Sequence, residues 1–399
     1  MFHGDRWQLA LGVQAAAGHA SWVGLRLMLA YQMLDATDSV ALVGLQAGTF
    51  AFAGLVVAIP AGRVADRAGG AVVASAGLLA CVAGTALALS ISSVGGALSA
   101  AAIIGVGHIC ALVGQQSLVA RLTTSRSTDA AFGTMTALSS VGQLAGPPIV
   151  TAAAMIGASG SDHPNTWPGL LACLLLLLIA LPSYFELRRA ERRSAAGEKA
   201  RPPRSTLRKV LRTPEVARAI LVSCMVIVAV DLLGTFLPVW AVQTGVAPFA
   251  VGMLLALRAA FTIVSRVGLS RLIDRFGRRV LLNVSLTLGA AGLIALPFAD
   301  VWWAIPLMIV LGIGLGIPQP ITMAWVVSVA PSGERGAILG ARMTVNRFAQ
   351  VVIPVSVSYF ASGVGDLGVF WIAGLFLGGG IVVVALAKIE PDSDSPPEP

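Results

Sequence analysis

Residues 62–70 read GRVADRAGG and stand between two apolar stretches of the chain. Residues 270–279, SRLIDRFGRR, repeat the pattern, with Asp274 standing 208 positions after Asp66. In both copies an acidic residue, arginines and glycine share one short segment. Because glycine permits tight turns, each copy is expected to form a polar hinge between two apolar helices. The recurrence predicts two related halves.

The composition excludes an ordinary soluble protein. Of the 399 residues, 56% are hydrophobic and 12% are charged, whereas soluble domains are about 25% charged. A bilayer can take up this much apolar surface, and a core surrounded by water cannot. The 44 glycines suit closely packed membrane helices. We therefore expect a polytopic membrane protein.

Windows of about twenty apolar residues predict twelve membrane-spanning helices and an all-α fold. The first helix lacks the features of a cleavable signal and is expected to stay as an anchor. The predicted spans lie near 8–33, 40–61, 71–92, 95–118, 129–156, 166–187, 217–241, 247–270, 279–298, 302–330, 336–361 and 366–388.

Basic residues alternate between the predicted loops. Loops on one side carry Lys or Arg, from Arg6 to Lys388, whereas loops on the other side carry Asp or His without a basic residue. Loops rich in Lys and Arg stay in the cytoplasm. The sequence therefore predicts cytoplasmic termini on a multi-pass protein, with the bacterial inner membrane as the expected location.

The excess positive charge is concentrated at the middle of the chain. Residues 188–218 carry eleven basic and three acidic residues, a net charge equal to the +8 of the whole chain. The charge therefore calls for no nucleic-acid partner. The expected domains are a six-helix half at 1–187, a basic cytoplasmic linker at 188–216, a second half at 217–388 and a disordered tail at 389–399. The linker could fix orientation, lie on anionic lipid, or bind a regulatory partner.

Several pairs support an internal repeat. Val43-Gly44 matches Val251-Gly252 at a separation of 208, and Pro147 matches Pro354 at 207. Such parallel repeats are related by an axis along the membrane normal, and a substrate site then lies between the halves near the bilayer midplane.

At this point the chain resembles the major facilitator superfamily of secondary transporters, whose loop motif reads Gly-x-x-x-Asp-Arg-x-Gly-Arg-Arg/Lys. The first copy departs at the basic pair, where Gly70 and Ala71 stand, and the second departs at Ser270. The matching residues are Gly62, Asp66, Arg67 and Gly69 in the first copy, and Asp274, Arg275, Gly277, Arg278 and Arg279 in the second.

The resemblance implies a gating role for this loop in stabilising the outward-open form. Asp66 and Asp274 could accept hydrogen bonds from exposed N–H groups at a neighbouring helix start, where the dipole favours negative charge. The basic residues Arg67, Arg275, Arg278 and Arg279 could pair with carboxylates or helix C-terminal carbonyls, in contacts that break between two states. The alternative is that these residues are inside-positive anchors.

The fifth predicted helix contains a glycine and proline pattern. Its spacing, G-x8-G-x3-G-P, resembles the antiporter motif of drug:proton exporters but lacks that motif's Gly-Gly at Val150 and Thr151. A kinked, glycine-lined helix could act as a hinge, and generic close packing is the other interpretation. The helix-4 motif that begins with Arg in proton antiporters is not evident. The hinge residues are Gly133, Gly142, Gly146 and Pro147.

Ionisable residues inside the predicted spans are costly and mark functional sites. Asp231 lies about fourteen residues into the seventh span. The repeat places it at a depth in the membrane similar to that of Arg26, so that the two could face each other across the cavity. The pair could couple transport to protons, or could form a static pair that gates or orients. His19 and His108 could also titrate, or simply bond between helices.

Several other residues could bind the substrate. An excess of buried Arg hints at an anionic or zwitterionic compound, since Arg binds carboxylate and phosphate, and aromatic rings could stack on a ring in the substrate. The candidates are Arg258, Asn346 and Arg347 with Gln115, Trp22, Phe236 and Trp325.

These features favour a proton-coupled secondary transporter that works by alternating access, most simply exporting a small organic compound. Proton-driven uptake of an organic anion is the alternative, and a non-transporting sensor on the same fold is a third. We expect a monomer. We also expect no enzymatic activity, cofactor or metal, since the sequence has no P-loop, nucleophile–base set or metal-ligand spacing.

Overall fold

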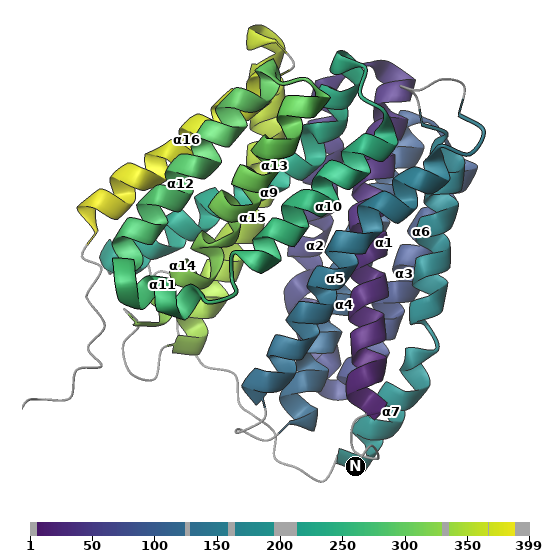
Figure 1. Cartoon of the computed structure of the whole chain (residues 1–399). Helices are drawn as coiled ribbons and strands as arrows, with labels where there is room; N and C mark the ends of the chain where they lie inside the picture. The colour runs from purple at the N-terminus through teal and green to yellow at the C-terminus, as the bar shows by residue number, and fades with distance from the viewer. Residues whose placement is uncertain are drawn as a thin grey trace, which may run out of the picture. The chain divides into compact units, whose positions relative to one another are not determined.

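The computed structural model describes residues 6–123, 128–158, 164–194, 214–328, 335–365 and 367–387. Within these ranges the chain is helical and contains no strand (Figure 1). The first helices are α1 (Arg6–Thr37), α2 (Val40–Ala68), α3 (Gly70–Ser90), α4 (Val94–Leu122), α5 (Thr128–Ala154), α6 (Thr166–Ala180) and α7 (Ser183–Ser194).

The later helices follow residue 213, after a stretch outside the described residues. They are α9 (Pro214–Thr244), α10 (Pro248–Val264), α11 (Leu269–Phe276), α12 (Arg278–Ala295), the short 3-10 helix η1 (Leu296–Phe298), α13 (Val301–Gly316), α14 (Pro318–Ser328), α15 (Arg335–Val364) and α16 (Gly368–Leu386).

The chain forms two compact units. The first comprises Met1–Ala200, Gly234–Ala256 and Val351–Asp366, and the second comprises the remaining segments. Eight helical segments in the described residues are long and apolar enough to cross a membrane, and a bent pair makes a ninth. The chain is therefore a multi-pass membrane protein, and the expected number of twelve spans stays a prediction.

The bent pair is formed by α10 and α11, which meet at an angle of 63°. Gly268 lies at the break with φ +74°, a left-handed conformation that favours glycine. The repeat aligns Gly268 with Pro60, which lies inside the uninterrupted helix α2. The two halves of the sequence therefore build their second membrane segment differently.

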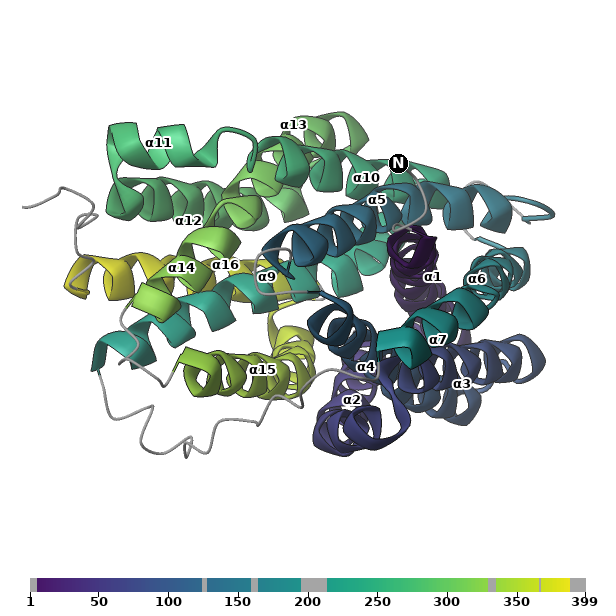
Figure 2. The same ribbon diagram turned by 90° about the horizontal axis from the view of Figure 1, so that it is seen from below.

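In the first unit, α1 packs against α4, α5 and α6, and Figure 2 shows it nearly end-on with α5 and α6 on either side. The most extensive helix contact is between α3 and α4. A Cβ on Gly107 would lie 2.5 Å from the carbonyl oxygen of Gly77 and 2.7 Å from the Cys81 sulfur. Small residues thus let the two backbones touch, as membrane helices require.

Helix α7 continues from the end of α6 and carries residues 188–194, the first part of the predicted linker. Its inner face is apolar where it meets the first unit: Leu187 is fully buried among side chains that include Leu11 and Leu118. The start of the predicted linker is thus an ordered helix packed on α1, α3 and α4.

Replacing Gly107 with Ala is expected to lower the free energy of unfolding by about 1–3 kcal/mol, because the added methyl group forces α3 and α4 apart. The matched control is Gly95→Ala on the same helix, where a Cβ would meet nothing within 4 Å. Thermal unfolding of the detergent-solubilised protein measures the difference. Equal midpoints for the two variants would contradict the packing argument.

Candidate functional site

The GRVADRAGG segment forms the turn between α2 and α3. Gly69 ends α2 and begins α3 with φ +102°, and its N–H donates to the carbonyl of Ala65. Gly277 does the same between α11 and α12, with φ +78° and a bond to Ile273. These glycines are 208 positions apart, as are their two acceptors. The sequence repeat is therefore a repeat of backbone geometry, set by positions that disfavour a Cβ.

Two arginines from distant helices satisfy the C-terminal end of α2. The guanidinium of Arg121, at the end of α4, donates to the carbonyl of Ala65 at 2.8 Å. That of Arg188, on α7, donates to the carbonyl of Ala68 at 2.9 Å. The last four carbonyls of a helix lack intrahelical partners and carry partial negative charge. Cationic donors are therefore well placed at this end.

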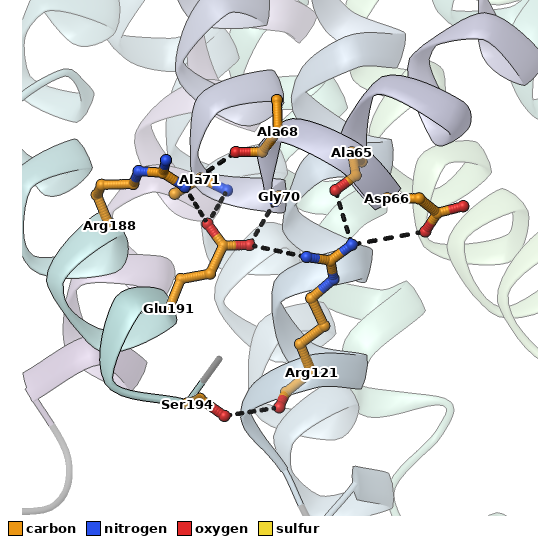
Figure 3. Close-up of polar contacts among 9 residues, drawn as sticks. All are labelled: Ala65, Asp66, Ala68, Gly70, Ala71, Arg121, Arg188, Glu191 and Ser194. Carbon is orange, nitrogen blue, oxygen red and sulfur yellow. Dashed lines mark hydrogen bonds and ion pairs between the residues drawn. The ribbon is translucent and has the colours of Figure 1, made fainter. Parts of the chain in front are cut away.

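One carboxylate satisfies the opposite end of the turn, the start of α3. Glu191, on α7, accepts the N–H of Gly70 at 2.6 Å and that of Ala71 at 3.3 Å. The same carboxylate lies 3.2 Å from the guanidinium of Arg188 and 3.6 Å from that of Arg121. Figure 3 shows these groups converging on the turn. A buried anion at a helix N-terminus with two cations beside it is electrostatically compensated.

Asp66 occupies the outer part of this network. Its carboxylate lies 3.6 Å from the guanidinium of Arg121, and its side chain is 74% exposed. The helix-start contact that the sequence suggested for Asp66 is thus made by Glu191, which lies 125 residues further on. The arginines that hold the network together, Arg121 and Arg188, were also not among the predicted site residues.

Close packing restricts two glycines of the first motif copy. A Cβ on Gly69 would lie 2.4 Å from the Glu191 carboxylate, and one on Gly70 would lie 2.6 Å from the carbonyl of Gly114. Both positions are therefore restricted by space, Gly69 also by its conformation. Gly70 and Ala71, which stand in place of the family's basic pair, form the start of α3, and their N–H groups donate to the Glu191 carboxylate.

The second copy uses its basic pair differently. Arg279, near the start of α12, donates to the carbonyl of Ala385 in the last turn of α16. Asp274 and Arg275 are exposed at the end of α11, as Arg67 is near the end of α2. Here a cation again satisfies a helix C-terminus. Arg278, the first residue of α12, is half-buried.

A second cluster lies inside the first unit and brings predicted residues together. The rings of Trp22 and His108 stack with centroids 4.4 Å apart and planes 7° apart. His19 lies edge-on to His108 at 5.9 Å. The Arg26 guanidinium lies 5.4 Å from the Trp22 ring and 6.0 Å from that of Phe50. A cation over aromatic faces is attracted by their quadrupoles.

This cluster borders a cavity of about 20 Å³ between α1, α3, α4 and α6, enough for one water molecule. Gln115 lines the cavity with His19, Trp22 and His108. A chain of buried hydrogen bonds starts at Gln115, whose side-chain amide donates to the Gln14 side chain at 3.2 Å. Gln14 in turn donates to the hydroxyl of Ser183 at 2.9 Å. A polar track therefore joins the cavity to the start of α7.

Arg26 also reaches α9, where its guanidinium donates to the hydroxyl of Thr235 at 2.5 Å. Asp231 lies one turn earlier on α9 and is 8% exposed. Arg26 is the partner that the sequence suggested for Asp231. In the structure its guanidinium binds the hydroxyl of Thr235, four residues after Asp231 on α9. A buried carboxylate in a membrane helix is energetically costly.

The remaining predicted substrate residues lie on α9, α10, α14 and α15. Phe236 and Trp325 are buried, as is Asn346, while Arg258 is half-buried. Arg347 donates to the Gln350 side chain at 3.1 Å. Within the first unit, the structure joins Trp22 and Gln115 to the histidines in one cluster.

The predicted hinge residues of α5 pack against α1. A Cβ on Gly142 would lie 2.1 Å from the carbonyl oxygen of Ala16, and one on Gly146 would lie 2.5 Å from that of Ala20. Pro147 lies inside α5, next to Gly146. The surroundings of the third glycine, Gly133, lie outside the described residues. Close helix contact is therefore one function of this motif.

Two further glycines that the repeat had paired make equivalent contacts within the first unit. A Cβ on Gly44 would lie 2.0 Å from the hydroxyl oxygen of Ser358, and one on Gly252 would lie 2.1 Å from that of Thr151. Ser358 and Thr151 are themselves separated by 207, the spacing of the repeat. The pairs Gly44–Ser358 and Gly252–Thr151 are thus one contact made twice.

The family model of the Major Facilitator Superfamily matches residues 11–354, and a second match covers 219–399. The chain belongs to the Major Facilitator Superfamily. This membership confirms the resemblance that the two loop motifs indicated. Because the superfamily is one of transporters, it also gives the coarse function, transport of small substrates.

Solved structures of superfamily transporters share the fold. A POT family transporter in complex with a thioalcohol-conjugated peptide gives a TM-score of 0.74 at 15% identity, over 95% of this chain and 94% of that one. The nucleoside transporter NupG gives 0.73 at 12% identity, over 95% and 98%. The peptide transporter POT with sulfate gives 0.74 at 15%, over 96% and 93%. A comparison with curated proteins found no match.

Replacing Glu191 with Gln is expected to lower the free energy of unfolding by about 2 kcal/mol, because the neutral amide loses the charge-assisted bonds at the start of α3. The control is Glu186→Gln, a half-buried residue on the same helix that lies outside the network of Figure 3. Thermal unfolding in detergent measures both. An equal loss in the two variants would show that Glu191 has no special role at the α2–α3 turn.

Proposed function

We propose that this superfamily member is a proton-coupled exporter of a small organic compound that works by alternating access. The observation that carries the proposal is the conjunction, within one transporter fold, of a charged α2–α3 turn and a buried cluster of titratable and aromatic side chains. The proposed molecule is a monomer of the bacterial inner membrane. It has twelve spans, two six-helix halves and cytoplasmic termini.

The two loop copies act as cytoplasmic gates in this proposal. Their residues Asp66, Arg67, Asp274, Arg275, Arg278 and Arg279 lie at helix ends, where charge contacts can form in one state and break in the other. The contacts of Asp66 and Arg121 at the α2–α3 turn support this role, because a partly exposed pair at 3.6 Å can separate at little cost.

The proton site is proposed at Asp231, with Arg26 as its cationic partner and His19 and His108 as further candidates. A buried carboxylate whose neighbouring cation changes partner binds and releases a proton, because the cation favours its charged form. The bond from Arg26 to Thr235, one turn from Asp231, supports the choice. Arg26 is the residue whose partner would change.

Export is favoured by the motif at Gly133, Gly142, Gly146 and Pro147 in α5, which we propose to act as the hinge. Proton-driven uptake of an organic anion is the second candidate. It is favoured by the half-buried residues Arg258 and Arg347, and by solved neighbours that hold a peptide conjugate, 5-aminolevulinic acid or sulfate. In either direction Trp22, Gln115, Phe236, Trp325 and Asn346 are proposed to contact the substrate.

The function is tested by comparing metabolites inside and outside cells that lack or overproduce the protein. A compound retained by the deletion strain and enriched outside on overproduction would establish export and name the substrate. A compound left unconsumed outside by the deletion strain would establish uptake instead. Binding of a ligand without flux in either strain would favour the sensor.

Replacing Asp231 with Asn should reduce pH-driven flux of that substrate in proteoliposomes by at least tenfold, because an amide cannot exchange the coupling proton. Exchange of substrate without a pH gradient should persist. The control is Asp300→Asn, since Asp300 caps α13 through a bond to the Trp303 N–H and Asn caps equally well. Intact pH-driven flux in the Asp231 variant would exclude this residue as the proton site.

The same flux assay tests the gates. An Asp66→Asn, Asp274→Asn double variant should slow both pH-driven flux and exchange several-fold, because both loops lose their carboxylate. Unchanged rates would count against gating and leave these residues as orientation signals.

A further inference from the structure

The outer surface of α6 and α7 carries one continuous exposed stripe. Its members follow spacings of three, four, three, four and three residues, which keep them on one side of a helix. All are exposed, and their character changes once along the stripe, from apolar to basic. The stripe consists of Leu175, Leu178, Pro182, Phe185, Arg189 and Arg192, with Arg193 beside it.

The apolar part of the stripe is strongly exposed. Leu175 is 53% exposed, Leu178 is 43% exposed and Phe185 is 74% exposed. Along the helix axis the aliphatic residues come first, the aromatic residue follows, and the arginines come last. The same order of groups is found along half of a phospholipid bilayer: acyl chains, the interface and the phosphates.

The depth of the stripe fits this comparison. Thr166–Ser194, the α6–α7 pair, qualifies as one candidate span of 29 residues, which is about 43 Å long at 1.5 Å per residue. The hydrocarbon core is about 30 Å thick and the bilayer with headgroups about 40–45 Å. The last turns of α7 therefore reach the headgroup layer, and the topology predicted from the sequence puts this layer on the cytoplasmic side.

The opposite face of α7 holds the helix in place. Ser183, Leu187 and Glu191 are buried, with Ser183 bonded to Gln14 and Glu191 bonded to the start of α3. The exposed arginines are therefore presented from a fixed helix. Glu191 faces inward, and among the described residues its ion pairs are with Arg121 and Arg188. Neither Glu186 nor Glu191 forms an ion pair with Arg189 or Arg192 in that part of the chain.

We propose that this stripe is a binding site for an anionic phospholipid. The phosphate lies between the guanidinium groups of Arg189 and Arg192, which are neighbours one turn apart, and an acyl chain lies along Phe185, Leu178 and Leu175. Arg pairs with phosphate through two parallel hydrogen bonds. Two neighbouring cations also repel a headgroup that carries its own positive charge, so the site selects a headgroup with a net negative charge. The inference concerns a lipid, and does not depend on the substrate or on the direction of transport.

The site is distinct from the general attraction between basic loops and the membrane. General attraction depends on the number of charges near the surface, whereas a site depends on two particular arginines. The Arg189→Gln, Arg192→Gln variant and a matched Arg6→Gln, Arg63→Gln control separate the two. Both remove two charges, and all four residues are exposed.

The test is native mass spectrometry of the full chain in a neutral detergent, after addition of equal amounts of phosphatidylglycerol and phosphatidylcholine with identical acyl chains. The wild-type protein and the control should retain phosphatidylglycerol in preference by about tenfold, and the Arg189, Arg192 variant should lose this preference. An Arg189→Lys, Arg192→Lys variant should keep part of it. Inorganic phosphate at millimolar concentration should not displace the lipid.

Three outcomes would overturn the proposal. They are a preference that survives in the Arg189, Arg192 variant, a preference that falls equally in the control, and displacement of the lipid by phosphate alone. A thermal midpoint equal to that of the wild-type protein confirms that each variant is folded. Phe185→Ala gives a second readout, because it should weaken retention of both lipids and leave the headgroup preference unchanged.

Discussion

The structure of the first unit depends on satisfying helix ends at the α2–α3 turn. The end of α2 exposes carbonyls and the start of α3 exposes N–H groups, so opposite partial charges meet within a few residues. Arg121 and Arg188 serve the first end, and Glu191 serves the second. These three side chains come from α4 and α7. The turn therefore ties four helices together and cannot move without breaking charged contacts.

Close helix contact is the second constraint, and it explains the glycines that recur in the repeat. A Cβ added to Gly44 or Gly252 would lie 2.0 or 2.1 Å from a hydroxyl oxygen, and a Cβ added to Gly107 would touch the backbone of α3. A bilayer offers no hydrophobic force between helices, so backbone approach is a main source of packing energy. Gly277 is favoured by its backbone conformation alone, whereas Gly44, Gly107 and Gly252 are restricted by close helix contact.

Composition and periodicity predicted the all-helical membrane fold, because a bilayer leaves few alternatives for an apolar chain. The repeat predicted the paired turns, since Gly69 and Gly277 are required locally. Glu191 could not be predicted because the N–H groups that it binds, those of Gly70 and Ala71, lie about 120 residues away in the sequence. Its neighbours in sequence are mostly basic, so the local pattern indicates only a charged segment. Its spacing of four from Leu187 and eight from Ser183 was the available signal of an inward face. Phe50 and Gln14 were missed because nothing local distinguishes a cluster member from a packing residue.

The difference between Pro60 and Gly268 has a mechanical consequence. Helix α2 is one continuous helix from Val40 to Ala68, so a displacement at its polar end passes along a single uninterrupted segment. The corresponding segment of the second half consists of two helices, α10 and α11, which meet near Gly268 at an angle of 63°. A break between two helices absorbs rotation that a continuous helix would transmit. The two loop copies, although alike in sequence, therefore follow helical segments of different shape, one continuous and one bent.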